Sequence, residues 1–317
     1  MAPAQENWAF AATVVCLLGL ATLVGRVLRN QTHLGLNPAA VDAFNSRVRS
    51  WWLICALLTV AFLSKTITVV LFGLLSFWAL REFITLTPTR LSDHRALFWV
   101  FFFFTPLQYV LVWLNLYEVY SVLIPVFAFL FIPMRISVAG DPKRFLERAS
   151  KIQAGLLVCV YCLSYAPAVL YLENPQLSYS SAARLLFLLV ILSMLSEAVQ
   201  HAWSRLYGKH VIAPEINQSR TWEGFLGSSA TIALVSAVLF QVGATPFAQL
   251  WQAALVGLLI AVMGLAGAMT LSAVKRDRRV QDYGTLVEGH GGVLDRIDAL
   301  CFAAPVFFHV VRQFVAV

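Results

Sequence analysis

Residues 249–272 read QLWQAALVGLLIAVMGLAGAMTLS, a stretch of 24 positions with no charged side chain. A helix needs about 20 predominantly apolar residues to cross the hydrocarbon core of a bilayer. A helix that is apolar on nearly every side is either buried in a large protein or spans a membrane. We therefore predict a transmembrane helix here, and the rest of the sequence extends the same pattern.

The composition of the whole chain fits a membrane protein. Of its 317 residues, 60% are hydrophobic and only 12% are charged, whereas soluble globular proteins carry about 25% charged residues. We predict an all-α, polytopic integral membrane protein with about ten transmembrane helices and short connections. The expected helices are 8–28, two within 51–84, 95–113, 116–135, 152–171, 182–203, 224–242, 249–272 and 298–315.

Two of these assignments need an argument. The stretch 51–84 would fit one long tilted helix, but Lys65 near its centre would cost about 3 kcal/mol of insertion free energy. We therefore place a break at Ser64-Lys65. The run 8–28 follows Glu6 and no basic residue, so we expect a retained helix rather than a secretory signal.

Lys and Arg gather in alternate loops. Twenty of the 23 lie in or beside the loops after the first, third, fifth, seventh and ninth expected helices, and only Lys65, Arg184 and Arg312 fall elsewhere. Since short loops rich in Lys and Arg stay in the cytoplasm, these five loops face the cytosol and both termini face outside. The net charge of +7 is therefore mainly a topology signal, and we expect no nucleic-acid partner.

The loop after residues 249–272 has the densest charge in the chain. Residues 272–298 read SAVKRDRRVQDYGTLVEGHGGVLDRID, with five basic and five acidic residues, one histidine and four glycines. Topology alone does not require both signs of charge. Carboxylates bind hard divalent cations, and Lys and Arg neutralise phosphate oxygens, so the loop suits a phosphate substrate with a divalent metal.

Residue spacing in this loop groups its side chains. If the preceding helix continues, four residues fall near one of its faces: Ser272, Lys275, Arg276 and Arg279. Asp295 and Asp298 share a face on the opening turn of the next helix, where a carboxylate pair could bind a metal. Acids also suit a helix N-terminus for structural reasons alone. The glycines after His290 would let backbone N–H groups approach a phosphate, and His290 could move a proton.

A second cytosolic loop is also unusual. Glu197 falls inside an otherwise apolar helix, where an acid needs a cation or a basic partner. A metal shared with the last loop would supply one, and a polar contact between helices is the alternative. Ser219 and Glu223, together with Thr221, could cap the next helix. Lys209 and Arg220 could contact a nucleotide triphosphate.

These residues resemble a known family. The last loop is similar to the signature of the CDP-diglyceride synthetases, also called phosphatidate cytidylyltransferases. The matching positions are Ser272, Lys275, Arg276, Asp282, Gly284, His290, Gly291, Gly292, Asp295, Arg296 and Asp298. The family's second motif is matched by Gly208, Lys209, Pro214, Thr221, Glu223, Gly224 and Gly227. The resemblance covers most of the chain, with its specific positions in the C-terminal two-fifths.

The resemblance implies a reaction and roles for these residues. CTP and phosphatidate, drawn from the membrane lipid, would give CDP-diacylglycerol and pyrophosphate with Mg²⁺, and a second cation and a homodimer stay open. The implied metal ligands are Asp282, Asp295, Asp298 and Glu197, and the further catalytic residues are His290 and Lys275. The implied substrate-binding residues are Ser272, Arg276, Arg296, Gly291, Gly292, Lys209, Arg220, Thr221 and Glu223.

The resemblance also implies an arrangement of the chain. We expect about six membrane helices in residues 1–180 and the catalytic region in 181–317, with the site on the cytosolic side of a cell inner membrane. The sequence departs from the family at Gln281, Glu197 and Arg220, where Lys, Asp and Lys are usual. These departures put substrate choice in doubt.

Three alternatives stay open. The same fold could act on another lipid phosphate or nucleotide, or the chain could be a membrane scaffold that has lost catalysis. A transporter is the third, although charge within the expected helices is sparse.

Overall fold

The computed structural model describes residues 64–86, 89–172, 179–243, 245–280, 283 and 292–315, with isolated positions at 19, 22, 23, 26, 27, 52 and 59. The chain divides into two compact units, Met1–Thr68 and Val69–Val317, which are described separately. In the first unit, Trp52 Nε1 donates a hydrogen bond of 2.9 Å to Thr22 Oγ1. The second unit contains every element discussed below, and α3 enters it from the first.

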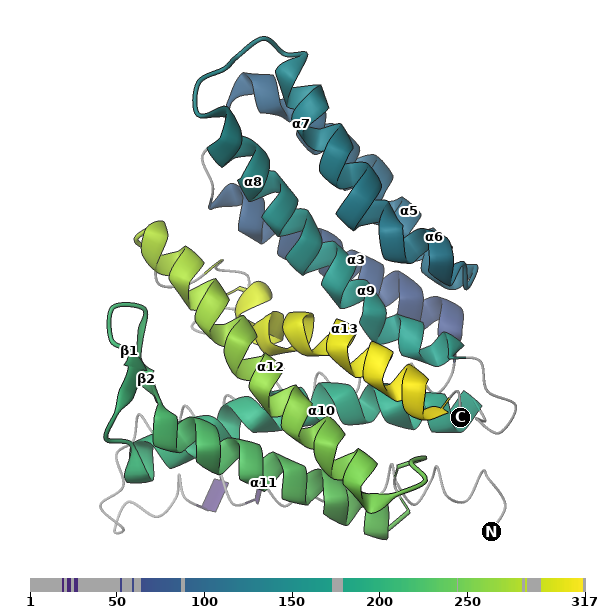
Figure 1. Ribbon diagram of the computed structural model, residues 1–317, viewed down its shortest axis with the longest axis vertical. Coiled ribbons are helices and arrows are strands. Elements are labelled where there is room, and N and C mark those ends of the chain that lie inside the picture. The colour runs from purple at the N-terminus through teal and green to yellow at the C-terminus, as the bar shows by residue number, and fades with distance from the viewer. Residues whose placement is uncertain are drawn as a thin grey trace. The chain divides into compact units, whose positions relative to one another are not determined.

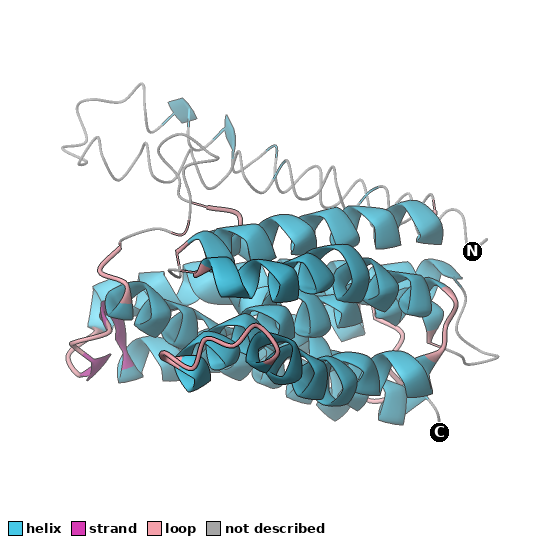
Figure 2. Cartoon of the chain, turned by 90° about the horizontal axis from the view of Figure 1, so that it is seen from above, coloured by secondary structure: helices cyan, strands magenta, loops and turns pink. Residues whose placement is uncertain are grey.

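Helices make up nearly all of the described chain, with one small hairpin (Figures 1 and 2). The N-terminal group consists of α3 (Lys65–Thr85), α4 (His94–Trp99), α5 (Thr105–Trp113), α6 (Tyr117–Val122), α7 (Phe129–Ser137), α8 (Phe145–Leu156) and α9 (Leu163–Ala168). Short η segments join them at Leu91–Asp93 (η2), Val100–Phe104 (η3), Leu123–Ala128 (η4), Leu157–Cys162 (η5) and Val169–Tyr171 (η6). The C-terminal group consists of α10 (Tyr179–Tyr207), β1 (Val211–Ala213), β2 (Asn217–Thr221), α11 (Trp222–Gln241), α12 (Leu250–Asp277) and α13 (Leu294–Val315).

The described helices confirm a polytopic membrane protein. Seven are long and apolar enough to cross a bilayer: Lys65–Thr85, Leu91–Trp113, Tyr117–Ser137, Phe145–Tyr171, Ser180–Tyr207, Trp222–Gln241 and Leu250–Asp277. They match the third to ninth expected helices, and the break at Ser64-Lys65 is confirmed because α3 begins at Lys65. The first two expected helices lie mainly outside the described residues. The tenth corresponds to α13, which is not among the seven, so the count of ten stays a prediction.

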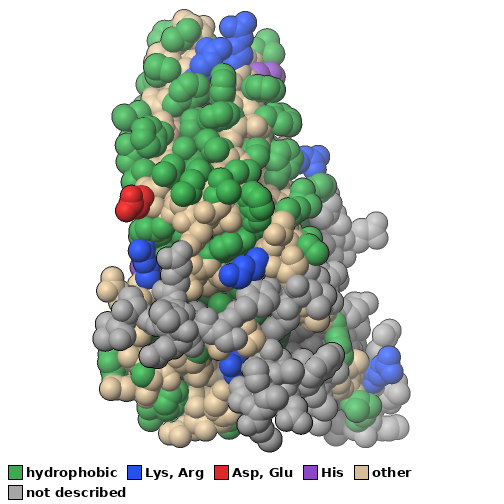
Figure 3. Space-filling view, turned by 90° about the vertical axis from the view of Figure 1, so that its right-hand side faces the viewer, with side chains coloured by type: hydrophobic (Ala, Val, Ile, Leu, Met, Phe, Trp, Pro, Cys, Tyr) green, Lys and Arg blue, Asp and Glu red, His purple; other side chains and the backbone are tan. Residues whose placement is uncertain are grey.

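The surface of the described helices suits a bilayer. Large hydrophobic side chains are exposed on α3 to α8, including Leu74, Phe102 and Leu130, which are each more than 60% exposed. Figure 3 shows one face where hydrophobic side chains predominate on the upper part of the described surface, with Lys and Arg at its upper end and at scattered positions lower down. Such a surface would be unfavourable in water, whereas lipid tails can cover it.

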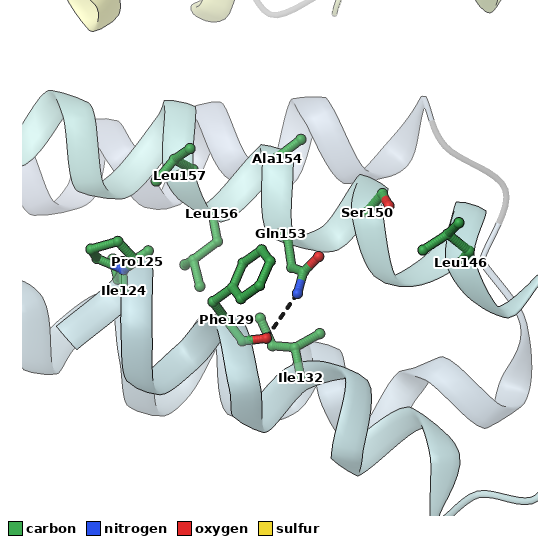
Figure 4. A pocket seen from close by; sticks show the side chains of 10 residues that line it. All are labelled: Ile124, Pro125, Phe129, Ile132, Leu146, Ser150, Gln153, Ala154, Leu156 and Leu157. Atoms are coloured by element: carbon green, nitrogen blue, oxygen red, sulfur yellow. Dashed lines mark hydrogen bonds between the residues drawn. The ribbon is translucent and has the colours of Figure 1, made fainter. Parts of the chain in front are cut away.

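Prolines in the α6–η4–α7 rod leave helix carbonyls without their usual donors, and neighbouring helices supply replacements. Pro125 and Pro133 have no N–H, so the carbonyls of Ser121 and Phe129 lose their standard partners. Tyr161 Oη donates to Ser121 O at 3.0 Å, and Gln153 Nε2 donates to Phe129 O at 2.8 Å. The second bond lies in a groove of about 350 Å³ between this rod and α8–η5 (Figure 4). Within a membrane, where water cannot pair these groups, such bonds hold kinked helices together.

Glycines bring α12 against α10 and α13. A Cβ atom added at Gly267 would lie 2.4 Å from the carbonyl oxygen of Asp298, so the backbones of α12 and α13 touch at that point. At Gly264 a Cβ atom would lie 3.1 Å from Ser196 Oγ of α10. Small residues at helix crossings allow this close approach in membranes. Neighbouring turns of α12 therefore contact Asp298 of α13 and Ser196 of α10, and Ser196 directly precedes Glu197.

Candidate active site

A short hairpin connects the two polar segments of the sequence. β1 and β2 pair antiparallel between α10 and α11, an element that the sequence analysis did not predict. Asn217 Nδ2 donates to Ser272 Oγ at 3.1 Å, and Arg276 Nε donates to the carbonyl of Ile216 at 3.2 Å. The hairpin thereby fixes one side of α12 at the start of the signature segment.

The helix face predicted beyond residue 272 is confirmed in part. α12 continues to Asp277, so Ser272, Lys275 and Arg276 lie on one continuous helix. Arg279 does not belong to it, because the helix has ended and Arg279 adopts a left-handed conformation with φ of 56°. The predicted face therefore has three polar members rather than four.

The start of α11 is organised by Thr221 and Glu223. The prediction that Thr221 caps the helix is confirmed, since its Oγ1 accepts a hydrogen bond of 3.1 Å from Gly224 N. Glu223 Oε2 accepts from the backbone N–H groups of Lys209 and His210 at 3.1 and 3.2 Å, and its Oε1 lies 2.5 Å from His210 Nδ1. Both side chains hold the hairpin onto α11, and their roles in binding substrate stay predictions.

Glu197 has a basic partner in the buried side chain of Arg220. Arg220 is only 3% exposed, and its Nη2 lies 3.3 Å from Glu197 Oε1. Its Nη1 donates to Gln200 Oε1 at 2.5 Å. In the described part of the chain, Arg220 Nε and Gln200 Nε2 are buried and donate no hydrogen bond. Buried donors without partners are costly, so this spot fits an anionic group.

Asp298 lies next to this group. It is 8% exposed, and its Oδ1 accepts the N–H of Ala299 at 2.6 Å. The charges of Glu197, Arg220 and Lys275 all act on its carboxylate. Two acids and two cations from α10, β2, α12 and α13 therefore act on one another electrostatically, and the direct contacts are Arg220 with Glu197 and Lys275 with Asp295.

Asp295 has a different environment from Asp298. Its Oδ1 accepts from Lys275 Nζ at 2.8 Å, and its Oδ2 accepts from the N–H groups of Tyr283 and Gly292, both at 2.9 Å. Arg296 follows on the same turn and is partly exposed. Asp295 thus closes the signature loop, because it contacts Lys275 at the beginning, Tyr283 in the middle and Gly292 at the end.

Tyr283 anchors the middle of the loop. It is buried, and its hydroxyl donates to the carbonyl of Leu271 at 2.8 Å. Burial, together with the nearby charge of Asp295, raises the pKa of Tyr283 well above its ordinary value. The hydroxyl therefore stays protonated, and keeps this hydrogen bond, even at alkaline pH where an ordinary tyrosine ionises.

The predicted metal ligands are brought together only in part. Glu197 acts electrostatically on Asp298, and both offer hard carboxylate oxygens, a donor type that fits Mg²⁺. Among the residues that the structure describes, no three Asp, Glu, His or Cys side chains form a complete metal group. Asp282, His290 and Gly291 lie outside the described residues, so their predicted roles stay predictions.

Glu82 is a site-forming residue that the sequence analysis missed. This acid near the end of α3 is 6% exposed and accepts the N–H groups of Val293 and Leu294 at 3.0 and 2.9 Å. A signal was present, because Glu82 is an acid within an apolar helix and must find donors there. Its partners are backbone groups, which residue types do not reveal.

Comparison with known proteins decides the family. A family model described as "Cytidylyltransferase family" matches residues 45–314. The chain belongs to the cytidylyltransferase family. The chain is 36% identical over 303 residues to the uncharacterized protein YnbB of Escherichia coli K12, covering 95% of the chain and 97% of YnbB.

Named enzymes match the chain over shorter stretches. It is 32% identical over 166 residues to the phosphatidate cytidylyltransferase of Mycobacterium bovis, covering 51% of the chain and 50% of that protein. It is 39% identical over 108 residues to the phosphatidate cytidylyltransferase of Bacillus subtilis, covering 34% of the chain and 39% of that protein. The chain thus spans about half or less of these two enzymes. The family resemblance seen in the signature residues is confirmed.

Proposed function

We propose that this protein is a phosphatidate cytidylyltransferase that acts on the cytosolic side of a cell inner membrane. It converts CTP and phosphatidate to CDP-diacylglycerol and pyrophosphate, a step of phospholipid biosynthesis. The observation that carries the proposal is the buried contact of Arg220 with Glu197 and Gln200, which leaves unpaired donors on Arg220 and Gln200. The charges of Glu197 and Arg220 also act on the buried carboxylate of Asp298. The named relatives support the substrate pair.

The chemistry needs positioning and charge neutralisation more than covalent catalysis. A phosphate oxygen of phosphatidate attacks the α-phosphorus of CTP, a new phosphoanhydride bond forms, and the bond to pyrophosphate breaks as pyrophosphate leaves with its electron pair. Arg220 and Lys275 would neutralise phosphate oxygens, and Arg276 would hold a phosphate at the rim of α12. Groups fixed in place before the reaction lower its barrier without reorganisation.

A divalent cation fits the carboxylate pair better than it fits Asp295. Asp298 and Glu197 would hold it, with Asp282 as the further predicted ligand. When bound, Mg²⁺ would neutralise charge on the reacting phosphates. Asp295 already accepts three hydrogen bonds, so its predicted role as a metal ligand becomes secondary to holding Lys275 in place.

A second candidate is the same reaction type with another lipid phosphate or nucleotide. Glu197 and Gln281 depart from the residues usual in the family, and Glu197 lies within the proposed site. The match over nearly the whole chain is to YnbB, whose printed name gives no substrate. These two observations favour testing substrate choice directly.

The deciding experiment uses the purified full-length protein in lipid nanodiscs with labelled CTP, phosphatidate and Mg²⁺. We expect CDP-lipid and pyrophosphate in equal amounts. Asp298→Asn should remove this activity, whereas Glu118→Gln, at an exposed position on α6, should retain it. Product from another nucleotide or lipid phosphate alone would support the second candidate. The absence of product with every pair would refute both.

A further inference from the structure

Glu82 caps a helix that begins 212 residues further along the chain. Its Oε1 accepts from Val293 N at 3.0 Å and its Oε2 from Leu294 N at 2.9 Å, at the start of α13. The first N–H groups of a helix have no partner within the helix, and the positive end of the helix dipole favours an anion. The buried Glu82 carboxylate supplies both the acceptors and the charge.

The next residue, Phe83, contacts the middle of the same loop. The ring of Phe83 stacks on Tyr283, with ring centres 6.3 Å apart and planes 15° apart. Behind it, a Cβ atom at Gly155 of α8 would lie 2.7 Å from the Phe83 ring, so α8 packs directly against this side chain. Glu82 and Phe83 therefore grip the loop at Tyr283 and at Val293, and we call this pair the α3 clamp.

The α3 clamp affects where the proposed catalytic residues lie. Asp295 follows the capped Leu294 directly, and Asp298 lies one helical turn further on. The rotation and depth of α13 fix where both carboxylates lie. Gly267 holds the same helix at Asp298, so α13 is held at one end by α3 and one turn later by α12.

We propose that Glu82 is a positioning residue for the active site, which sets the start of α13 and thereby places Asp295 and Asp298. The inference rests on the proposed function for its activity measurement, but its geometric part is independent of it. A displacement of about 1 Å at a catalytic group can cost about a hundredfold in rate. A cap that only stabilised the fold would lower the amount of folded protein and leave turnover unchanged.

The test compares Glu82→Gln with Glu82→Asp and the control Glu118→Gln, all as full-length protein in nanodiscs. The Gln variant keeps the volume but replaces one acceptor oxygen with an NH₂ group, which cannot accept from a backbone N–H. We expect its kcat to fall at least about tenfold and its KM for CTP to change much less. Glu82→Asp, which keeps the charge, should restore part of the rate, and Glu118→Gln should match the wild type.

Hydrogen exchange supplies a measurement that does not depend on activity. The amides of Val293 and Leu294 should exchange faster in Glu82→Gln than in the wild type and the control. Unchanged exchange, or a wild-type kcat in the folded Gln variant, would overturn the inference. If the wild type makes no CDP-lipid, the proposed function fails, and faster exchange alone then decides whether Glu82 positions α13.

Discussion

Lys275 at the end of α12 and Asp295 in the first turn of α13 form an ion pair, with Nζ 2.8 Å from Oδ1. The two side chains are only 20% and 10% exposed. The other carboxylate oxygen accepts two backbone N–H groups, so a single side chain closes a loop whose ends lie 20 residues apart. A charge-assisted pair with this little solvent exposure is stronger than a surface pair.

Replacing Asp295 by Asn should cost both stability and activity. The amide would present an NH₂ group either to the Lys275 ammonium or to two N–H donors, and each arrangement leaves a donor unsatisfied. We expect a loss of about 1–3 kcal/mol in unfolding free energy, together with a large fall in CDP-lipid formation. Thermal unfolding in detergent and the activity assay measure the two effects.

Asp277→Asn is the matched control for this change. Asp277 is the last residue of α12, its side chain is 67% exposed, and it pairs with Arg278. Exposed pairs contribute little, so the control should lie within about 0.5 kcal/mol of the wild type. Equal effects of the two substitutions would contradict the special role of Asp295.

Gly267→Ala should separate α12 from α13. The new Cβ atom would lie 2.4 Å from the backbone oxygen of Asp298, and a backbone atom cannot rotate away as a side chain can. We expect a loss of about 1–3 kcal/mol and a lower rate, because Asp298 moves with its helix. Leu258→Ala, at a 40% exposed position on α12, should leave the rate unchanged. Wild-type activity in Gly267→Ala would show that the crossing tolerates displacement.

Arg148→Met should destabilise the N-terminal helices without touching the active site. Arg148 Nη2 lies 2.6 Å from Asp93 Oδ1, and the two side chains are 4% and 1% exposed. Removing the cation leaves the Asp93 carboxylate buried without its charged partner, which costs about 3–5 kcal/mol. Arg144→Met, at a side chain that is 75% exposed, is the control. Thermal unfolding of the two variants should differ clearly, and equal melting temperatures would contradict the prediction.

Much of the fold follows from the sequence because each membrane helix is encoded by one continuous apolar run of residues. The uncharged stretch 249–272 is long enough to require α12, and the cost of Lys65 in a bilayer places the start of α3. Thr221 was predictable as a cap because capping depends on residues a few positions apart. The β1–β2 hairpin was not, since its strands are only three and five residues long and the longer one consists of polar residues alone.

The candidate site was less predictable because its contacts cross the chain. The signature spacing located Asp295 and Asp298, but it could not tell that the Asp295 carboxylate pairs with Lys275 while Glu197 acts electrostatically on the Asp298 carboxylate. The role of Glu82 depends on two N–H groups more than 200 residues away, which have no residue-type signature. Spacing identifies candidate side chains, whereas the three-dimensional packing assigns their partners.

Glu197→Gln provides the sharpest test of the proposed cation site. If Glu197 and Asp298 share Mg²⁺, removing one negative charge weakens cation binding, while the amide oxygen can still accept from Arg220. We expect the Mg²⁺ concentration for half-maximal activity to rise at least about tenfold, as for loss of about 1.4 kcal/mol of binding free energy. Titration with Mg²⁺ after treatment with EDTA measures this, and EDTA alone should abolish the activity.

Glu197→Asp separates two ways in which Glu197 could act. The shorter side chain restores the residue usual in the family and keeps the charge. It also withdraws the carboxylate from Arg220, whose Nη2 lies 3.3 Å from Glu197 Oε1 in the wild type. If the cation is what Glu197 serves, the Asp variant should keep a nearly normal Mg²⁺ requirement while the Gln variant does not. If both variants lose rate at an unchanged Mg²⁺ requirement, Glu197 acts only by orienting Arg220, and the proposed pair with Asp298 is wrong.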